Sequence, residues 1–179
     1  GVRLVGSEMC IRDSSGTIGD AAAVDTLSTD IRALSGGTAE INLTGVTAIS
    51  GTFAQLETII DDSGAVGSNS KFSGVAAQAL TEDSGEGISV ANANKLSGAT
   101  TGKVTATIAT GSLATLNGLS AAAQPANGDA FALTLNDTTV DAGDLATLDS
   151  KVDQAGGGSI NMNTVCLLYT SDAADDRCC

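Results

Sequence analysis

The sequence predicts an α/β repeat array, solenoid-like, in which strands and short helices alternate and the strands pair in parallel. Three observations predict it: apolar residues recur at helical and at strand spacing in turn, glycines separate these segments, and their order repeats along the chain. The clearest example is 132–160, where an alternation ALTL precedes a helix-spaced segment, a glycine break and a second extended run. Alternating strands and helices favour parallel pairing with right-handed crossovers.

The first unit, residues 15–73, contains two predicted helices around one strand. A helix is predicted over 22–34, and a Gly-Gly pair follows its last apolar residue, as is typical of helix ends. A strand is predicted over 40–49, bent at Gly45, and Thr52 is placed to cap a helix that begins at Phe53. The apolar stripe of the first helix is Val24, Leu27, Ile31 and Leu34.

The second unit, residues 74–129, and the third, residues 130–165, repeat this order. The segment from Gly111 to Leu116 matches Gly51 to Leu56, which is the clearest internal correspondence. The third unit is truncated before its second helix. The predicted unit is therefore strand, short helix, strand, short helix. The predicted elements are strands at 79–81, 104–110 and from 132 and 160, and helices over 88–96, 112–116 and 140–148.

Two alternatives to the α/β array stay open. Thr, Val and Gly are abundant and the helical segments are short, which would also suit a β-solenoid with short helical corners. Leu, Ile, Val and Phe make up roughly a fifth of 15–165, close to the composition of disordered chains, so disorder is the third alternative. A folded form would have a thin core of small aliphatic side chains.

Both ends of the chain resemble translated sequencing-adapter sequence. Residues 4–14 read LVGSEMCIRDS and residues 166–176 read CLLYTSDAADD, which resemble the two complementary adapter strands in one reading frame. We therefore expect 1–14 and 166–179 to be non-native and 15–165 to be a fragment of a longer gene. The four cysteines all lie in these flanks, so they predict no disulfide or zinc framework for 15–165.

The charge of the chain excludes several classes of partner. Between residues 15 and 165 there are sixteen acidic and five basic side chains, and clustered Lys and Arg for phosphate backbones are lacking. We expect no nucleic-acid partner, and no apolar run is long enough to predict membrane insertion. The sequence has no histidine and its cysteines lie in the flanks, so the usual acid–base, nucleophilic and zinc sites are not predicted. We expect no catalytic residues and no enzyme.

Acidic turns are the candidate calcium ligands. Asp137, Asp141 and Asp144 lie within eight residues, but an EF-hand starting at Asp137 would need glycine at its sixth position and glutamate at its twelfth. Those positions hold Ala142 and Leu148. Asp61-Asp62 and Glu82-Asp83 form similar acidic pairs. We therefore assign no metal ligands and no cofactor, and keep calcium as an alternative to solvated carboxylates and helix N-terminal charges.

Gly156–Ser159 is the one glycine run that suggests a phosphate loop. It leads into a predicted strand and not into a helix, and no Gly-Lys-Ser/Thr follows. A loop or linker is the prediction for this segment.

Segments such as LTLNDTTVDAGDLATLDSK and ISVANANKLSGATTGKVTATI resemble the Ala/Thr/Asp-rich repeats of very long surface proteins of marine bacteria and cyanobacteria. The resemblance implies a non-enzymatic structural or adhesive repeat segment of a large secreted or cell-surface protein, with neighbouring repeats as its partners. It implies no site residues. The alternatives are a calcium-dependent binding module of an extracellular protein and a carbohydrate-active domain that takes its catalytic residues from elsewhere.

Overall fold

The computed structural model describes residues 16–64, 70–120, 128–152, 156–162 and 166–168. The segment 1–14, expected to be non-native, lies outside these residues, as do 169–179 of the C-terminal flank. Residues 65–69, 121–127, 153–155 and 163–165 also lie outside them.

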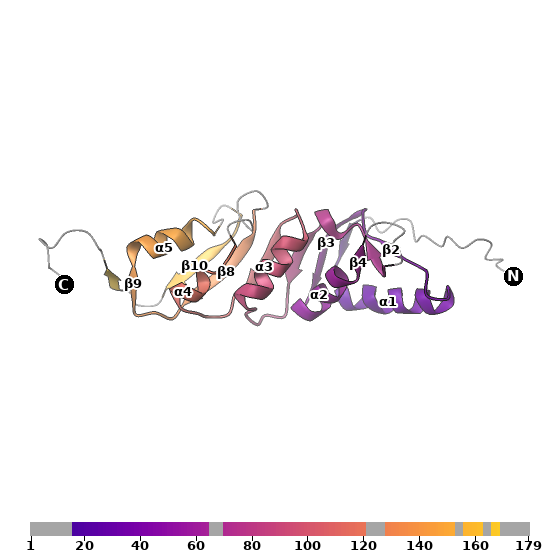
Figure 1. Ribbon diagram of the computed structural model, residues 1–179, viewed down its shortest axis with the longest axis horizontal. Helices are drawn as coiled ribbons and strands as arrows, with labels where there is room; N and C mark the ends of the chain where they lie inside the picture. Colours follow the sequence, from indigo (N-terminus) through magenta and orange to yellow (C-terminus); the bar gives the residue numbers. More distant parts are fainter. Residues whose placement is uncertain (1–15, 65–69, 121–127, 153–155, 163–165, 169–179) are drawn as a thin grey trace, which may run out of the picture.

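A six-stranded parallel sheet runs through the molecule, and its strands are arranged in the order in which they occur in the chain (Figure 1). Paired residues of neighbouring strands lie 24 to 31 positions apart, as in Leu80↔Val104 and Ala48↔Ala79. The strands are β1 (Gly16–Ile18), β3 (Val46–Gly51), β6 (Ala79–Glu82), β7 (Val104–Thr107), β8 (Ala130–Leu135) and β10 (Ser159–Met162).

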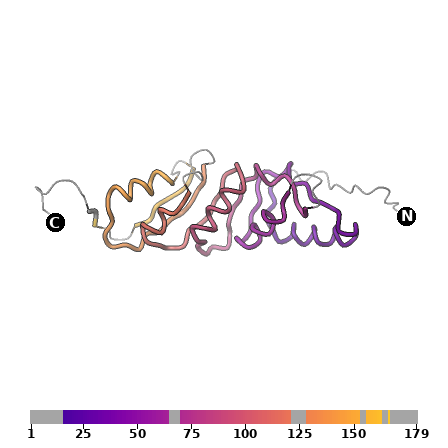
Figure 2. Tube along the Cα trace, in the orientation of Figure 1, coloured from indigo at the N-terminus to yellow at the C-terminus, as the bar shows by residue number. Residues whose placement is uncertain are grey.

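In the chain, one helix follows each of the first five strands of this sheet, β1, β3, β6, β7 and β8. Because every crossover joins neighbouring parallel strands in the same direction, right-handed connections place the helices on one face of the sheet. The elements succeed one another along the long axis from α1 to α5, and the tube shows the same elongated path (Figures 1 and 2). The helices are α1 (Ala21–Leu34), α2 (Phe53–Asp61), α3 (Val90–Ala99), α4 (Leu113–Leu116) and α5 (Ala142–Asp149).

Polar residues at the ends of the strands start these helices. Asp20 Oδ1 accepts from the backbone N–H groups of Ala22 and Ala23, and Asp141 Oδ1 does the same at the start of α5. Ser89 and Ser112 cap α3 and α4 in the same way, and Gln55 Oε1 accepts from the N–H of Thr52 at α2. Each cap satisfies N–H groups that have no partner within the helix.

Short strands form two smaller sheets beside the six-stranded one. A three-stranded parallel sheet has the order β2-β5-β4, and a further pair joins β9 to β11 in parallel. A 3-10 turn, η1 (Val75–Ala77), precedes β6. The short strands are β2 (Ile41–Asn42), β4 (Ser63–Gly64), β5 (Phe72–Ser73), β9 (Thr139–Asp141) and β11 (Cys166–Leu168).

The core is one continuous layer between the sheet and the helices. Across the sheet, Ile18, Ile49, Leu80 and Val104 are aligned in register, and Leu133 is aligned with Ile160. These side chains belong to a single apolar cluster with Leu56, Leu96, Leu116 and Leu148 from the helices. Two phenylalanines, Phe72 and Phe131, are fully buried in it.

The structure confirms the α/β class and the parallel pairing. The predicted helix 22–34 forms as α1, the cap at Thr52 starts α2, and the predicted bend at Gly45 is the turn between β2 and β3. Three predicted boundaries are wrong. Ile88 pairs with Ile108 in an isolated parallel bridge and does not belong to a helix, because Ser89 caps α3. Val140 belongs to β9 and not to a helix, because Asp141 caps α5, and the strand from Val104 ends at Thr107.

Gly102, just before β7, lies against the backbone of Gln78 and Ala79 at the start of β6. A Cβ at this position would be 2.3 Å from the carbonyl oxygen of Gln78. Thr100 Oγ1 also donates to this oxygen, at 2.6 Å, so it is held in place. We expect Gly102→Ala to lower the free energy of unfolding by about 1–3 kcal/mol through overpacking against backbone, measured by urea denaturation.

Gly98→Ala is the matched control. A Cβ at Gly98 would meet nothing within 4 Å, and the residue lies in α3. Alanine should therefore raise the free energy of unfolding, by up to about 1 kcal/mol, through helix propensity. Equal effects of the two substitutions would contradict the close contact at Gly102.

Candidate functional site

The face of the sheet that points away from the helices carries small, uncharged side chains. In register, Ser50 lies beside Thr81 and Thr81 beside Thr105; further along, Thr134 lies beside Asn161. These residues are half-buried or exposed, whereas their neighbours along each strand are mostly buried apolar residues. The outward positions of the paired strands that are half-buried or exposed are Thr17, Ala48, Ser50, Ala79, Thr81, Thr105, Thr107, Ala132, Thr134, Ser159 and Asn161. We call this surface the outer sheet face.

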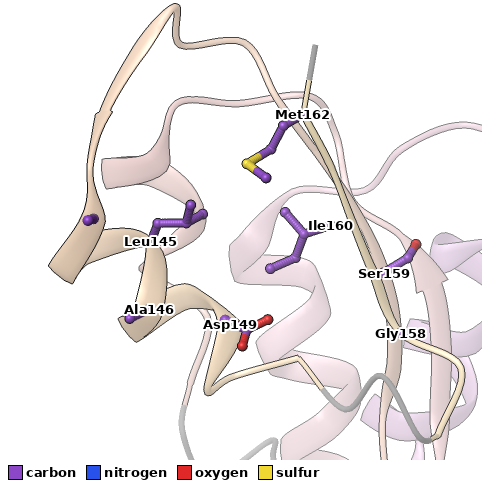
Figure 3. Close-up of a pocket in the computed structure, with 8 residues that line it drawn as sticks. Leu145, Ala146, Asp149, Gly158, Ser159, Ile160 and Met162 are labelled. Carbon is purple, nitrogen blue, oxygen red and sulfur yellow. The ribbon is translucent and has the colours of Figure 1, made fainter. Parts of the chain in front are cut away.

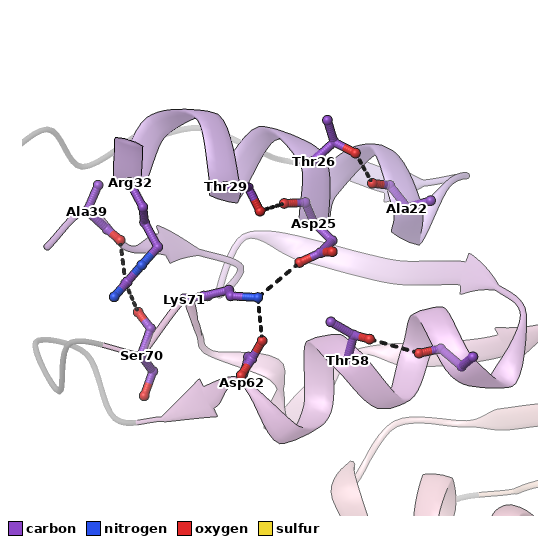
Figure 4. Close-up of polar contacts among 11 residues, drawn as sticks. Ala22, Asp25, Thr26, Thr29, Arg32, Ala39, Thr58, Asp62, Ser70 and Lys71 are labelled. Carbon is purple, nitrogen blue, oxygen red and sulfur yellow. Dashed lines mark hydrogen bonds and ion pairs between the residues drawn. The ribbon is translucent and has the colours of Figure 1, made fainter. Parts of the chain in front are cut away.

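Basic side chains at the N-terminal end hold successive elements together (Figure 4). Lys71 Nζ lies 2.7 Å from Asp62 Oδ2 and 3.5 Å from Asp25 Oδ1, and so joins the end of α2 to α1. The hydrogen bond to Asp62, with the charges of Asp62 and Asp25, raises the pKa of Lys71. Arg32 donates to the carbonyl oxygens of Ala39 and Ser70.

The remaining lysines of the described residues make similar links. Lys95 of α3 bridges Glu57 and Asp61, which lie one turn apart on α2, at 2.8 and 2.9 Å. Lys103 donates to the carbonyl of Gly156, and Lys151 donates to the carbonyl of Asn117. Each basic side chain between 16 and 162 that the structure describes therefore contacts an acceptor of its own chain.

Lys95→Met should weaken the contact between α2 and α3. The hydrogen bonds to Glu57 and Asp61 raise the pKa of Lys95 above 10.5, so the link is intact at neutral pH and is lost only as the pH rises through that raised pKa. The pair is solvent-exposed, so we expect a small decrease in melting temperature at low salt that disappears in 1 M NaCl. A salt-independent decrease would show that the alkyl chain, not the charge, stabilises the contact.

Two buried polar side chains, one just before β6 and one just before β8, form hydrogen bonds with earlier parts of the chain. Gln78 Nε2 donates to the carbonyl of Leu43 at 2.9 Å. Asp129, which has no exposed surface, accepts from the Ser97 hydroxyl at 2.6 Å and from the Val104 N–H at 2.7 Å. Burial raises the pKa of Asp129, while these two hydrogen bonds and the charge of Lys103 act in the opposite direction.

The structure does not bring the candidate calcium ligands together; each carboxylate has its own position and partners. Asp141 caps α5, Asp144 is exposed in its first turn, and Asp137 accepts from the N–H of Leu113 at the start of α4. Asp61 and Asp62 are paired with lysines, as described above. Glu82 is buried and its Oε1 accepts from the N–H of Ser84.

Within the described residues, no group of three or more His, Cys, Asp or Glu side chains is arranged to hold a metal ion. The glycine run 156–159 leads into β10, as predicted, and Gly157 has a φ of 100° in that turn.

A groove lies at the C-terminal end of the sheet, between α5 and β10 (Figure 3). Its volume is about 490 Å³. Leu145 projects from α5, and Ile160 and Met162 project from β10 toward it. Ala142 and Ala146 complete the apolar lining, with Asp149 and Ser159 at its border. We call this the α5–β10 groove.

The α5–β10 groove was not predicted from the sequence. Periodicity places Leu145 and Ile160 on inward faces, but it does not show that the space between them is unfilled. Leu27 and Leu34 present the same difficulty: both belong to the predicted apolar stripe of α1, yet they are 46% and 83% exposed.

Comparisons with known proteins identify no relative: no family model, no curated protein and no solved structure matches the chain. Among the residues that the structure describes, no helix is long and apolar enough to cross a membrane.

Proposed function

We propose that the chain is a solenoid-like α/β repeat array that serves as a non-enzymatic structural or adhesive segment of a large secreted or cell-surface protein. The observation that carries this proposal is the strand order β1-β3-β6-β7-β8-β10, in which each new strand and helix is added beside the previous one. Such growth can continue without limit, because every unit contacts only its neighbours. The repeating step is one strand and one helix, half of the unit predicted from the sequence.

The outer sheet face and the pairing of the basic side chains support a role in structure or adhesion more than a role in catalysis. The outer sheet face is a broad, uncharged layer of Ala, Ser, Thr and Asn side chains on an acidic chain. The basic side chains contact acceptors within the chain, which disfavours nucleic acid as a partner. Buried Asp129 is bound by a backbone N–H and by Ser97, an arrangement that fixes the fold.

A single long, adapter-free sequencing read of the parent gene tests the proposal. We expect 4–14 and 166–176 to be absent, strand–helix units of 24 to 31 residues to continue on both sides, and a secretion signal to lie upstream. Finding both peptides encoded in the genome, with no such units beside them, would overturn it.

A calcium titration separates the structural role from the calcium-dependent module. For the structural role we expect millimolar calcium to change the melting temperature no more than magnesium does at the same ionic strength, because general screening acts equally for both ions. A specific increase with calcium would favour the calcium-dependent module, since a ligand that binds only the folded state raises its stability.

A further inference from the structure

We propose that Asn117, which precedes Gly118 at the end of α4, is a site of spontaneous deamidation, and that hydrogen bonds from α3 and from the end of α5 delay this reaction while the chain is folded. The only co-reactant is water. The inference goes beyond the proposed structural role, because it concerns a chemical change of the chain itself. Its success or failure leaves that role untouched.

An asparagine followed by glycine is the sequence in which deamidation meets the least steric hindrance, because glycine has no side chain. The backbone nitrogen of Gly118 attacks Cγ of Asn117, and the new N–Cγ bond closes a five-membered imide. The Cγ–Nδ2 bond breaks, and Nδ2 leaves as ammonia with the proton of the attacking nitrogen. Water then adds to one of the two imide carbonyls and opens the ring. The products are aspartate and isoaspartate, and either one adds a negative charge.

Three hydrogen bonds hold the backbone around the reacting atoms. The Gly118 N–H donates to the carbonyl of Thr115 at 3.0 Å, and Asn94 Nδ2 of α3 donates to the carbonyl of Gly118 at 2.9 Å. Lys151, just after α5, donates to the carbonyl of Asn117. Because α3, α4 and α5 succeed one another along the molecule (Figure 1), these bonds fix the end of α4 from both sides. We call the three bonds the Asn117 clamp.

The Asn117 clamp holds the backbone in a conformation that does not react. The φ and ψ of Asn117 are −64° and −11°, which are helical values. Closing the imide requires Cβ of Asn117 and the nitrogen of Gly118 on the same side of the Cα–C bond, whereas a helical ψ turns them apart. Deamidation in the folded chain therefore requires local opening of the clamp.

The side chain of Asn117 is held only weakly. Its Nδ2 donates to the carbonyl of Asp144 at 3.2 Å, and its Oδ1 is buried without a hydrogen-bond partner among the described residues. A buried acceptor without a donor is unfavourable, so the side chain adds little to the clamp. After deamidation an oxygen replaces Nδ2 and faces the Asp144 carbonyl, which is also an acceptor. The product is therefore repelled from this position, and the contact between α4 and α5 is weakened.

Peptide mapping by mass spectrometry measures the reaction, with fragmentation that assigns each modified residue. The full chain is incubated in mildly alkaline buffer with a reductant that keeps the cysteines free. The reference is a synthetic peptide of residues 112–120, SLATLNGLS, which is too short to form a stable helix. We expect Asn117 to deamidate about tenfold or more slowly in the folded chain than in the peptide, because the hydrogen bonds of the clamp must open first.

Variants of the clamp test whether these bonds set the rate. Lys151→Met and Asn94→Ala each remove one bond and should accelerate deamidation of Asn117 by about threefold to tenfold. Lys71→Met is the matched control, because it removes the same charge from a lysine whose partners are on α1 and at the end of α2. Its rate should equal that of the wild type. Gly102→Ala is the control for overall stability, since it is expected to destabilise the chain without touching the clamp.

Two results would overturn the proposal. If Asn117 reacted as fast in the folded wild type as in the peptide, the clamp would give no protection. If the clamp variants reacted no faster than Gly102→Ala, the reaction would proceed through unfolding of the whole chain. Asn117→Asp, which mimics one product, gives a separate measurement: its melting temperature should fall, and an unchanged value would contradict the repulsion at Asp144.

Discussion

Replacing Phe131 by alanine is expected to lower the free energy of unfolding by about 3–5 kcal/mol, the usual loss when a buried phenylalanine is truncated. Phe131 has no exposed surface and lies on the inner face of β8. Its partner in register on β7 is Ala106, whose small side chain leaves space for the ring. Truncation to alanine leaves a cavity where the ring was. The surrounding cluster consists mainly of aliphatic side chains, which are too small to fill it.

Urea denaturation followed by circular dichroism measures this loss, and hydrogen exchange locates it. Because β8 pairs with β7 in the sheet, the protection should fall first in β7 and β8, next to the cavity. Phe53→Ala is the matched control, because Phe53 is only partly buried at the start of α2 and should lose less. Equal losses at the two positions would show that β8 is not a more tightly packed part of the core.

The sequence was sufficient to predict the elements because each is specified locally. The helix after Thr52 follows from a capping residue and four apolar residues at helical spacing, and the structure places α2 there. The misplaced start at Val140 has a local cause as well. The spacing from Val140 to Leu148 suits a helix. Asp141, however, is more stable as a helix cap than inside a helix, so α5 begins after it.

Contacts between elements that are far apart in the chain could not be predicted in the same way. Lys95 reaches Glu57 over 38 positions, and Ser97 reaches Asp129 over 32 positions, and no local pattern specifies either distance. The stripe of α1 shows the same limit. Periodicity groups Leu27 with Ile31, but only the position of α1 at the end of the sheet leaves the first exposed while the second is buried.

Among the contacts that the sequence does not predict, those of Asp129 have the largest expected effect on stability. The sequence places it at the end of a polar loop, where a carboxylate would be solvated and easily replaced. In the structure it is buried and holds α3 and β7 together through Ser97 and Val104. A buried polar group of this kind is stable only while its partners remain in place.

Asp129→Ala is expected to lower the free energy of unfolding by about 2–4 kcal/mol. The substitution leaves the buried N–H of Val104 and the hydroxyl of Ser97 without their acceptor, and each orphaned group costs about 1–3 kcal/mol. Asp129→Asn is the control, because an amide can accept from Val104 through its oxygen and donate to Ser97 through its nitrogen. If alanine and asparagine were equally destabilising, the hydrogen bonds would not be the cause.

The comparison of wild type with Asp129→Asn also has a defined dependence on pH. Burial raises the pKa of Asp129 above its ordinary value of 3.8, so the folded state binds this proton more tightly than the unfolded state. The contribution of Asp129 to stability is therefore greatest at low pH and falls as the pH rises from 3.8 through the raised pKa. Urea denaturation of both proteins from pH 3 to pH 7 should show the wild type losing stability relative to Asp129→Asn across that interval. A constant difference would mean that the carboxyl titrates alike in the folded and unfolded chains, and that its burial is energetically unimportant.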